Sequence, residues 1–215
     1  MKSIYFIGSS ISSEACYGYS DVDILVFHRR VKFPWIKFNG VSVVILPYPR
    51  NGLIIEWDWN KPSALATKMF LTTPKKLILG ERIEQYLRRD TRVSLVELRL
   101  WLMKRFLGAR AGLESGNYRR VLKNYVKAIW AFYAYENLEP KTFTWKNMAE
   151  TLRNVKPKVL DVKYIGKAID ACKKLYCCST ISFDEAYEYY DLTDELYIKT
   201  TNIYLKELKK TKDES

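Results

Sequence analysis

The chain has 215 residues, a formal net charge of +12 and a hydrophobic content of 48%. Enough apolar side chains are present to bury a core, which excludes a disordered chain and leads us to expect one or two globular domains. No apolar run reaches the length of a membrane span or of the apolar part of a signal peptide, so we expect a cytoplasmic protein with no membrane partner.

The first third of the chain predicts strands. Runs of apolar and β-branched residues indicate strands over 3–8, 21–27, 31–38, 41–46 and 53–59, with a further short strand or extended link at 75–79. Asn39-Gly40 separates two of these runs and is the strongest hairpin signal in the sequence. His28 follows the second run and is interpreted as a strand-end or surface residue.

From residue 62 onward the pattern becomes helical. Apolar residues at helical spacing predict helices over 62–70, 81–89, 93–107, 118–136, 145–153 and 159–176, and a last helix that opens with the capping box of Ser182 and Glu185. Gly108, Gly112 and Gly116 predict a loop. We therefore expect an α+β fold, in which a small mixed N-terminal sheet with flanking helices (1–80) precedes a C-terminal α-helical bundle (81–215).

The last predicted helix carries a regular apolar seam. Its apolar and aromatic residues alternate at intervals of four and three, which is typical of a helix that packs along its length. The residues of this seam are Phe183, Tyr187, Tyr190, Tyr197, Thr201, Tyr204 and Leu208.

The positive charge is concentrated outside the predicted sheet. Residues 75–127 hold fourteen Lys and Arg against five Asp and Glu. Such a segment can form a surface that attracts a triphosphate, an RNA backbone or an acidic protein. The alternative is a set of solvated helix faces with no partner.

Two carboxylates stand at the start of the second predicted strand. Asp21 and Asp23 are separated by one residue, so their side chains lie on the same face of the strand. Carboxylate oxygens are the ligands that Mg²⁺ prefers, with the remaining positions filled by water and substrate phosphates. Upstream, the turn at Gly8-Ser9-Ser10 would let a phosphate approach the backbone closely.

These elements together resemble a known signature. Ile7-Gly8-Ser9, then eleven residues from Ser10 to Ser20, then Asp21-Val22-Asp23-Ile24 resemble the polymerase-β-like nucleotidyltransferase superfamily, in particular its small, minimal or aminoglycoside-type members with a C-terminal helical domain. The match directly covers the first quarter of the chain.

The resemblance implies an activity and a site. It implies transfer of a nucleoside monophosphate from a nucleoside triphosphate, with ATP as the first choice, to a hydroxyl of a protein, an RNA end or a small molecule, with release of pyrophosphate. Mg²⁺ or Mn²⁺ would be the cofactor. The implied nucleotide-binding residues are Gly8, Ser9, Ser10 and Ser20, and the implied metal ligands include Asp21 and Asp23.

The third acid of such a site has two candidates. Glu56 and Asp58 share one face of the fifth predicted strand, so either can be the third catalytic carboxylate or the general base, with Asp58 as a further metal ligand. The alternative for both is a solvent-facing sheet edge.

In several branches of the superfamily the third acid lies on a strand resembling residues 40–47, which contain no acid here. This absence leaves a second function open: a catalytically degenerate relative that binds nucleic acid or protein through its basic helices. A third hypothesis, a helical interaction protein whose acidic pair is accidental, is disfavoured by the spacing of the Gly-Ser turn.

Overall fold

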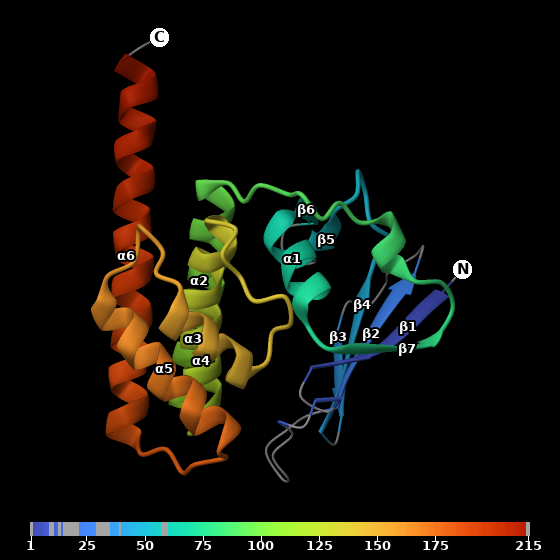
Figure 1. Cartoon of the computed structure of the whole chain (residues 1–215), viewed down its shortest axis with the longest axis horizontal. Helices are drawn as coiled ribbons and strands as arrows, with labels where there is room; N and C mark the ends of the chain where they lie inside the picture. Colours follow the sequence, from blue (N-terminus) through green and yellow to red (C-terminus); the bar gives the residue numbers. More distant parts are fainter. Residues whose placement is uncertain are drawn as a thin grey trace. The chain divides into compact units, whose positions relative to one another are not determined.

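The computed structural model describes residues 2–8, 11, 12, 14, 22–28, 35–38, 40–56 and 60–213 (Figure 1). The chain forms two compact units. The first, called the sheet unit, comprises residues 1–91 and 140–147, and the second, called the helical unit, comprises residues 92–139 and 148–215. The expected α+β class is confirmed. The division expected at residue 80 instead follows Thr91, and the sheet unit also takes a short segment from later in the chain.

Five strands make the main sheet. They are β1 (Lys2–Ile7), β2 (Val22–His28), β3 (Trp35–Phe38), β4 (Val41–Leu46) and β7 (Lys75–Leu79), in the order β3-β4-β2-β1-β7. β2 and β4 are parallel, whereas the other neighbouring pairs are antiparallel. The expected hairpin is confirmed, because β3 pairs with β4 and Gly40 between them has a φ of +76°.

The fifth predicted strand lies outside the main sheet. β5 (Ile54–Glu56) pairs with β6 (Lys61–Ser63) in a separate two-stranded sheet, and residues 57–59 lie outside the described residues. Helix α1 (Ala64–Thr72) follows at once, and Ser63 caps it by accepting a hydrogen bond from the Ala66 N–H. The backbone N–H of Ile54 donates to the hydroxyl of Thr67 at 2.8 Å, which joins β5 to α1.

One face of the main sheet is buried by α1 and by the residues after β7. Tyr5 and Phe27 on the sheet make edge-to-face contacts with Phe70 of α1, each with ring centroids 5.5 Å apart. Ile83, in the 3₁₀ turn η2 (Ile83–Tyr86), is fully buried in the same core. Its backbone N–H donates to the Tyr5 hydroxyl at 2.7 Å, and that hydroxyl donates to Glu84 at 2.8 Å. These contacts keep residues 81–91 with the sheet and replace the helix expected at 81–89.

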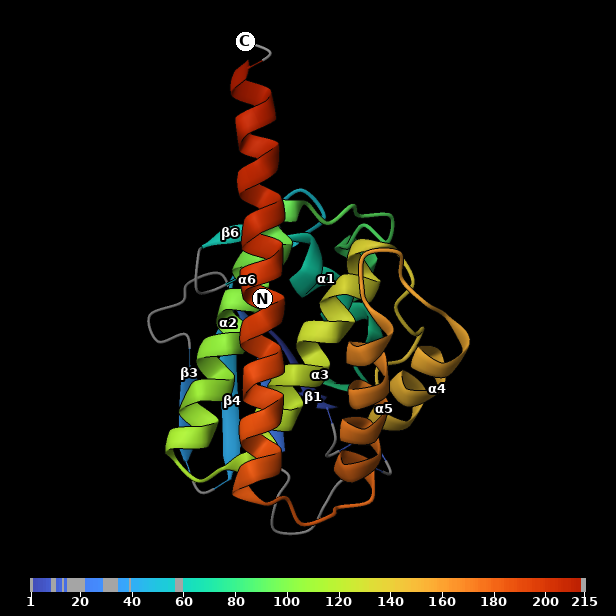
Figure 2. The same ribbon diagram turned by 90° about the vertical axis from the view of Figure 1, so that its left-hand side faces the viewer.

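The helical unit contains α2 (Leu95–Glu114), α3 (Tyr118–Tyr135), α5 (Val162–Tyr176) and α6 (Phe183–Asp213), together with most of α4 (Trp145–Asn154) (Figure 2). α2 packs on α3 and α6, and α3 also packs on α5 and α6. The centre of this unit is α3, whose Tyr125, Trp130 and Tyr133 are fully buried. No helix among the described residues combines the length and the apolarity that crossing a bilayer requires.

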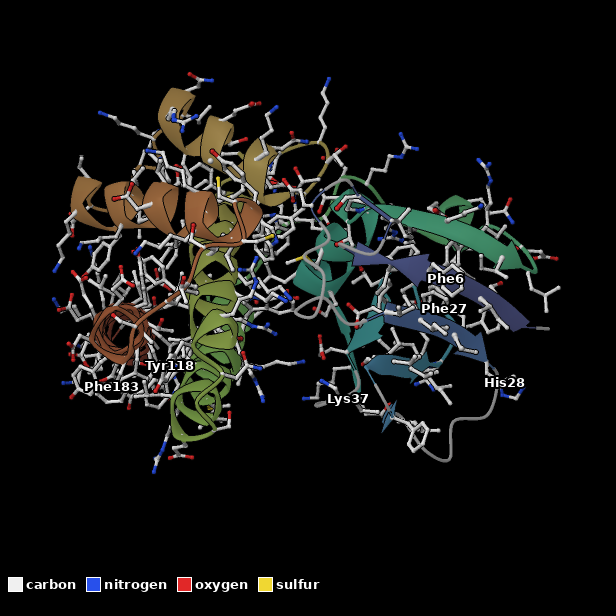
Figure 3. All side chains as sticks on the ribbon, turned by 90° about the horizontal axis from the view of Figure 1, so that it is seen from below. Phe6, Phe27, His28, Lys37, Tyr118 and Phe183 are labelled. Carbon is white, nitrogen blue, oxygen red and sulfur yellow. The ribbon has the colours of Figure 1, made fainter. Side chains whose placement is uncertain are left out.

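The seam predicted for the last helix is confirmed only in part. Phe183, Tyr187 and Leu208 are exposed, and the fully buried residues of α6 include Ala186, Thr193, Leu196 and Thr200, which the predicted seam does not contain. Phe106 of α2 stacks on Tyr190 and Tyr197 of α6, with ring centroids 5.5 and 5.8 Å apart. Figure 3 shows Tyr118 and Phe183 near each other, and their rings meet edge to face at 6.0 Å. The capping box is also present, because the Ser182 N–H donates to Glu185 at 3.0 Å and the Glu185 N–H donates to the Ser182 hydroxyl at 3.2 Å.

The loop expected around the three glycines is wrong for two of them. Gly108 and Gly112 lie inside α2, where each lets α3 approach closely. A Cβ on Gly108 would lie 2.7 Å from the Asn124 side-chain oxygen, and a Cβ on Gly112 would lie 3.1 Å from Val121. Only Gly116, with a φ of +68°, lies between the two helices. Gly108 and Gly112 therefore serve helix packing rather than chain reversal.

Candidate functional site

Gly8 of the predicted Gly-Ser turn lies next to Asp23 of the predicted acidic pair. Gly8 follows β1 directly, and Ile7 at the end of β1 stands opposite Asp23 in β2. Gly8 has a φ of +82°, and a Cβ placed on it would lie 3.4 Å from Oδ2 of Asp23. The turn is fixed on both sides, because the Gly8 N–H donates to the Pro74 carbonyl at 2.9 Å and the Ile11 N–H donates to the Gly8 carbonyl at 3.2 Å. The structure thus brings the glycine and the second aspartate together.

The other residues implied for the same site cannot be placed. Asp21, Ser9, Ser10, Ser20 and Asp58 lie outside the described residues.

A row of side chains crosses the sheet at the level of Asp23. Residues directly opposite on neighbouring strands point to the same face, so the register places Ser42 of β4 beside Asp23 and Lys37 of β3 beside Ser42. Ser42 is buried and Lys37 is exposed. Lys37 and Ser42 are not part of the sequence motif, although the Asn39-Gly40 hairpin signal fixes them opposite each other.

His28 does not belong to this row. It ends β2 five residues after Asp23, which corresponds to about 17 Å along an extended strand. Figure 3 shows Lys37 and His28 at opposite ends of the sheet. His28 is therefore a strand-end residue, as expected.

Glu56 lies in the separate two-stranded sheet, whereas Asp23 lies in the main sheet. It ends β5, stands opposite Lys61 of β6, and is only 6% exposed. A solvent-facing sheet edge is therefore wrong for Glu56. The strand that pairs with β2 is β4, and its residue at the level of Asp23 is Ser42 rather than an acid. Within the described part of the chain, no three His, Cys, Asp or Glu residues are grouped so that they could hold a metal ion.

Lys75 stands opposite Ile7 at the other end of the row. Its ammonium group donates to the carbonyls of Phe70 at 2.7 Å and Leu71 at 3.1 Å, the last turn of α1. Burial lowers the pKa of Lys75, and the nearby carboxylate of Glu84 opposes this effect. Lys75 therefore serves the C-terminal end of α1, where a cation is favourable.

Many of the positive charges in residues 75–127 are engaged within the fold. The segment belongs to both units, since the division follows Thr91. Examples are Arg99, which donates to the Thr201 hydroxyl at 3.2 Å, Arg105, which lies over the Trp101 ring, and Arg119, which donates to the Leu175 carbonyl. These contacts hold the three guanidinium groups against the fold without neutralising them, so these side chains are less available to a partner.

Glu14, between the turn and the acids in the sequence, is anchored elsewhere in the sheet unit. The carboxylate of Glu14 accepts hydrogen bonds from the first two backbone N–H groups of α4, at 2.6 and 2.7 Å. A carboxylate at this position is favoured by the unpaired N–H groups and the dipole of the helix.

No protein-family model and no curated protein matches this sequence. Asp23 offers hard oxygen ligands beside Gly8, which has no side chain, and Lys37 offers a cation on the same face of the sheet. This combination suits a divalent cation and an adjacent phosphate group.

Proposed function

We propose that this protein is a metal-dependent nucleotidyltransferase. It would bind a nucleoside triphosphate, with ATP as the first choice, and transfer the nucleoside monophosphate to a hydroxyl of a protein, an RNA end or a small molecule. The observation that carries the proposal is the position of Gly8, which has a left-handed backbone conformation and lies beside Asp23, since a Cβ on Gly8 would be in contact with Oδ2 of Asp23 at 3.4 Å.

The chemistry of Asp23 suits a hard divalent cation. Asp23 is half-buried at the beginning of β2, where a carboxylate can reach both the sheet and solvent. Asp23 and Asp21 would hold Mg²⁺ or Mn²⁺, with Asp58 or Glu56 as the third acid. When bound, the metal would neutralise phosphate charge and stabilise the attacking and leaving oxygens.

The chain's own residues would position the reactants. The acceptor oxygen forms a bond to the α-phosphorus, the bond from that phosphorus to the bridging oxygen breaks, and pyrophosphate leaves with the electron pair. Glu56 or Asp58 would take the proton of the acceptor hydroxyl. The turn at Gly8, Ser9 and Ser10, with Ser20, would hold the phosphates, and Lys37 would add a positive charge on the same side of the sheet.

One observation favours the second candidate function, a relative of the nucleotidyltransferases that binds nucleic acid or protein without catalysis. The neighbour of Asp23 on β4 is Ser42, which cannot replace a carboxylate as a charged metal ligand or as a base at neutral pH. Such a protein would retain the turn and the sheet while lacking turnover.

Transfer of label from α-labelled ATP, CTP, GTP and UTP tests the proposal. The wild type and the Asp23→Asn variant are incubated with Mg²⁺ or Mn²⁺ and with total RNA, protein or small metabolites. We expect the wild type to label one acceptor class and Asp23→Asn to lose at least about 100-fold in rate, because the variant removes a charged ligand.

The matched control is Asp90→Asn, the same substitution at an exposed aspartate of the sheet unit, which should keep wild-type activity. Absence of transfer together with absence of metal-dependent nucleotide binding in calorimetry would favour the non-catalytic relative.

A further inference from the structure

A tight turn after β4 carries one arginine and supports a second. The backbone N–H and carbonyl of Arg50 both pair with Leu53, at 2.9 Å each. Asn51 and Gly52 between them have φ values of +53° and +78°, which is typical of a two-residue hairpin turn. The Gly52 carbonyl accepts a hydrogen bond from the backbone N–H of Arg88 at 2.8 Å. The stem of Arg88 lies across Gly52, because a Cβ on this glycine would be only 2.5 Å from Cγ of Arg88.

The guanidinium groups at this turn have no acidic partner. Arg50, Arg88 and the adjacent Arg89 are exposed, and within the described part of the chain none of them forms a side-chain hydrogen bond or an ion pair. The acid next to them in the sequence, Asp90, is exposed and likewise forms no ion pair with a described residue. By contrast, three lysines of α5 pair with glutamates of α6. Like charges on two neighbouring segments repel each other, so this arrangement favours a bound anion.

An exposed aromatic ring lies in the same region. Tyr86 is 49% exposed, stands two residues before Arg88, and donates its hydroxyl proton to the Glu81 carboxylate at 2.6 Å. This hydrogen bond raises the pKa of Tyr86, and Tyr48, two residues before Arg50, lies close enough to add a smaller contribution. The ring is therefore held at the surface near the turn.

Guanidinium groups beside a fixed aromatic ring suit a single-stranded nucleic acid. The planar fork of an arginine binds phosphate oxygens through paired N–H bonds, and an exposed ring stacks on an unpaired base. We propose that Arg50, Tyr86, Arg88 and Arg89, which we call the arginine turn, bind the phosphates and a base of a single-stranded nucleic acid. An acidic protein would satisfy the charges but would leave the Tyr86 ring without a planar partner.

The arginine turn is separate from the candidate site at Gly8 and Asp23. β4 begins at the level of Asp23, beside Ser42, and the turn follows the other end of this strand. None of its four residues belongs to the proposed catalytic set. A failure of nucleotide transfer therefore leaves the inference standing, and a failure of nucleic-acid binding leaves the proposed transfer reaction standing.

Fluorescence anisotropy of the full chain with labelled oligouridylate and oligodeoxythymidylate of about twelve nucleotides tests the proposal. The variant Arg50→Gln/Arg88→Gln/Arg89→Gln should raise the dissociation constant at least about 30-fold. It should also flatten the dependence of log affinity on log salt by about 2, because each phosphate contact on a single strand contributes about 0.7. The three residues are exposed, so the variant should keep the wild-type circular dichroism and melting temperature. Comparison of the two probes shows whether RNA or DNA is preferred.

The matched control is Arg120→Gln/Arg153→Gln/Lys156→Gln, which removes the same three charges from exposed residues of the helical unit. It should bind close to the wild-type affinity. Equal losses in the two triple variants would mean that binding follows net charge alone, and would overturn the proposal.

Two variants of Tyr86 test the stacking contact. Tyr86→Ala should weaken binding at least about 5-fold, whereas Tyr86→Phe, which keeps the ring and loses the hydrogen bond to Glu81, should bind like the wild type. The proposal fails if Tyr86→Ala binds as tightly as the wild type. It also fails if polyglutamate of the same charge displaces the labelled strand as effectively as the unlabelled strand does, since the surface would then accept an acidic protein.

Discussion

The Glu14 carboxylate accepts a hydrogen bond from the backbone N–H of Trp145 at 2.6 Å, across 131 positions of sequence. Its second oxygen accepts from the Lys146 N–H at 2.7 Å, and the Thr144 hydroxyl accepts from the Asn147 N–H at 3.1 Å. The first three N–H groups of α4 are thus all satisfied by side chains. The segment between the Gly-Ser turn and the aspartates is thereby attached to a helix end of the same unit.

We predict that Glu14→Gln lowers the free energy of unfolding by about 1–2 kcal/mol, because one of two carboxylate oxygens is replaced by an amide group that cannot accept from an N–H. Urea denaturation of the full chain measures this loss. The control is Asp184→Asn in the first turn of α6, where the acid lies near the positive end of the helix dipole and the cost should be about 0.5 kcal/mol. Equal losses in the two variants would contradict a specific role for Glu14.

A comparison of two glycines tests the candidate site. Gly8 and Gly40 both have positive φ, at +82° and +76°, so replacing either with Ala should cost about 1–2 kcal/mol of stability. Only at Gly8 would the added Cβ meet a neighbour, Oδ2 of Asp23, since nothing lies within 4 Å of a Cβ on Gly40.

Calorimetric titration with Mg²⁺ and ATP distinguishes the two variants. We expect Gly8→Ala to weaken binding about 10-fold or more, because its methyl group occupies the space between the turn and the carboxylate, and we expect Gly40→Ala to bind like the wild type. If both variants bind equally well, the Gly8 turn does not contact the nucleotide.

Turn and capping residues correctly predicted the parts of the fold that depend on positions close together in the sequence. The β3–β4 hairpin, the strand at 75–79 and the caps of the helices follow from turn residues and capping residues a few positions apart. The two glycines in α2 could not be interpreted in this way, because their role depends on Asn124 and Val121 of another helix. The turn at residues 83–86 likewise depends on Tyr5, nearly eighty positions earlier.

The candidate site likewise has features that nearby residues determine and features that depend on distant parts of the chain. The proximity of Gly8 to Asp23 follows from two strands joined by a short spacer, and the sequence motif indicated it. The position of Ser42 depends on the parallel pairing of β2 with β4, a non-local register that no turn residue determines. The burial of Glu56 depends on the pairing of β5 with β6 in a separate sheet, which the apolar pattern of 53–59 does not reveal.

The ammonium group of Lys75 offers a third prediction. Lys75→Met keeps the aliphatic stem but removes the donor for the Phe70 and Leu71 carbonyls, so the free energy of unfolding should fall by about 1–2 kcal/mol at pH 7. Because burial lowers the pKa of Lys75 in the folded state, the unfolded chain binds more protons between that value and the ordinary 10.5. In this window Lys75 makes stability rise with pH.

Urea denaturation of both proteins at a series of alkaline pH values checks this dependence. The difference in unfolding free energy between wild type and Lys75→Met should grow as pH rises toward 10.5, because the folded wild type loses its buried charge at a lower pH than the unfolded chain does. A difference that stays constant across this window would mean that the ammonium group titrates normally.

The last prediction concerns Tyr133 in α3, whose ionisation makes stability fall, rather than rise, as pH increases. Its hydroxyl donates to the Val155 carbonyl at 2.8 Å, and burial raises its pKa from 10.0 to about 12, with a smaller contribution from Glu136. A folded-state pKa above the unfolded value means that the folded chain holds its proton more strongly. The stabilisation from Tyr133 is complete below pH 10.0 and is lost as pH rises through about 12.

Tyr133→Phe should therefore cost about 1 kcal/mol at pH 7 through the lost hydrogen bond, and should lose stability less steeply than the wild type above pH 10. Denaturation at several alkaline pH values, together with the near-ultraviolet absorbance of tyrosinate, measures both effects. The wild type should show a tyrosine that ionises only near pH 12, and the variant should lack that step. If the two absorbance titrations coincide, the Tyr133 hydroxyl is not shielded within the helical unit.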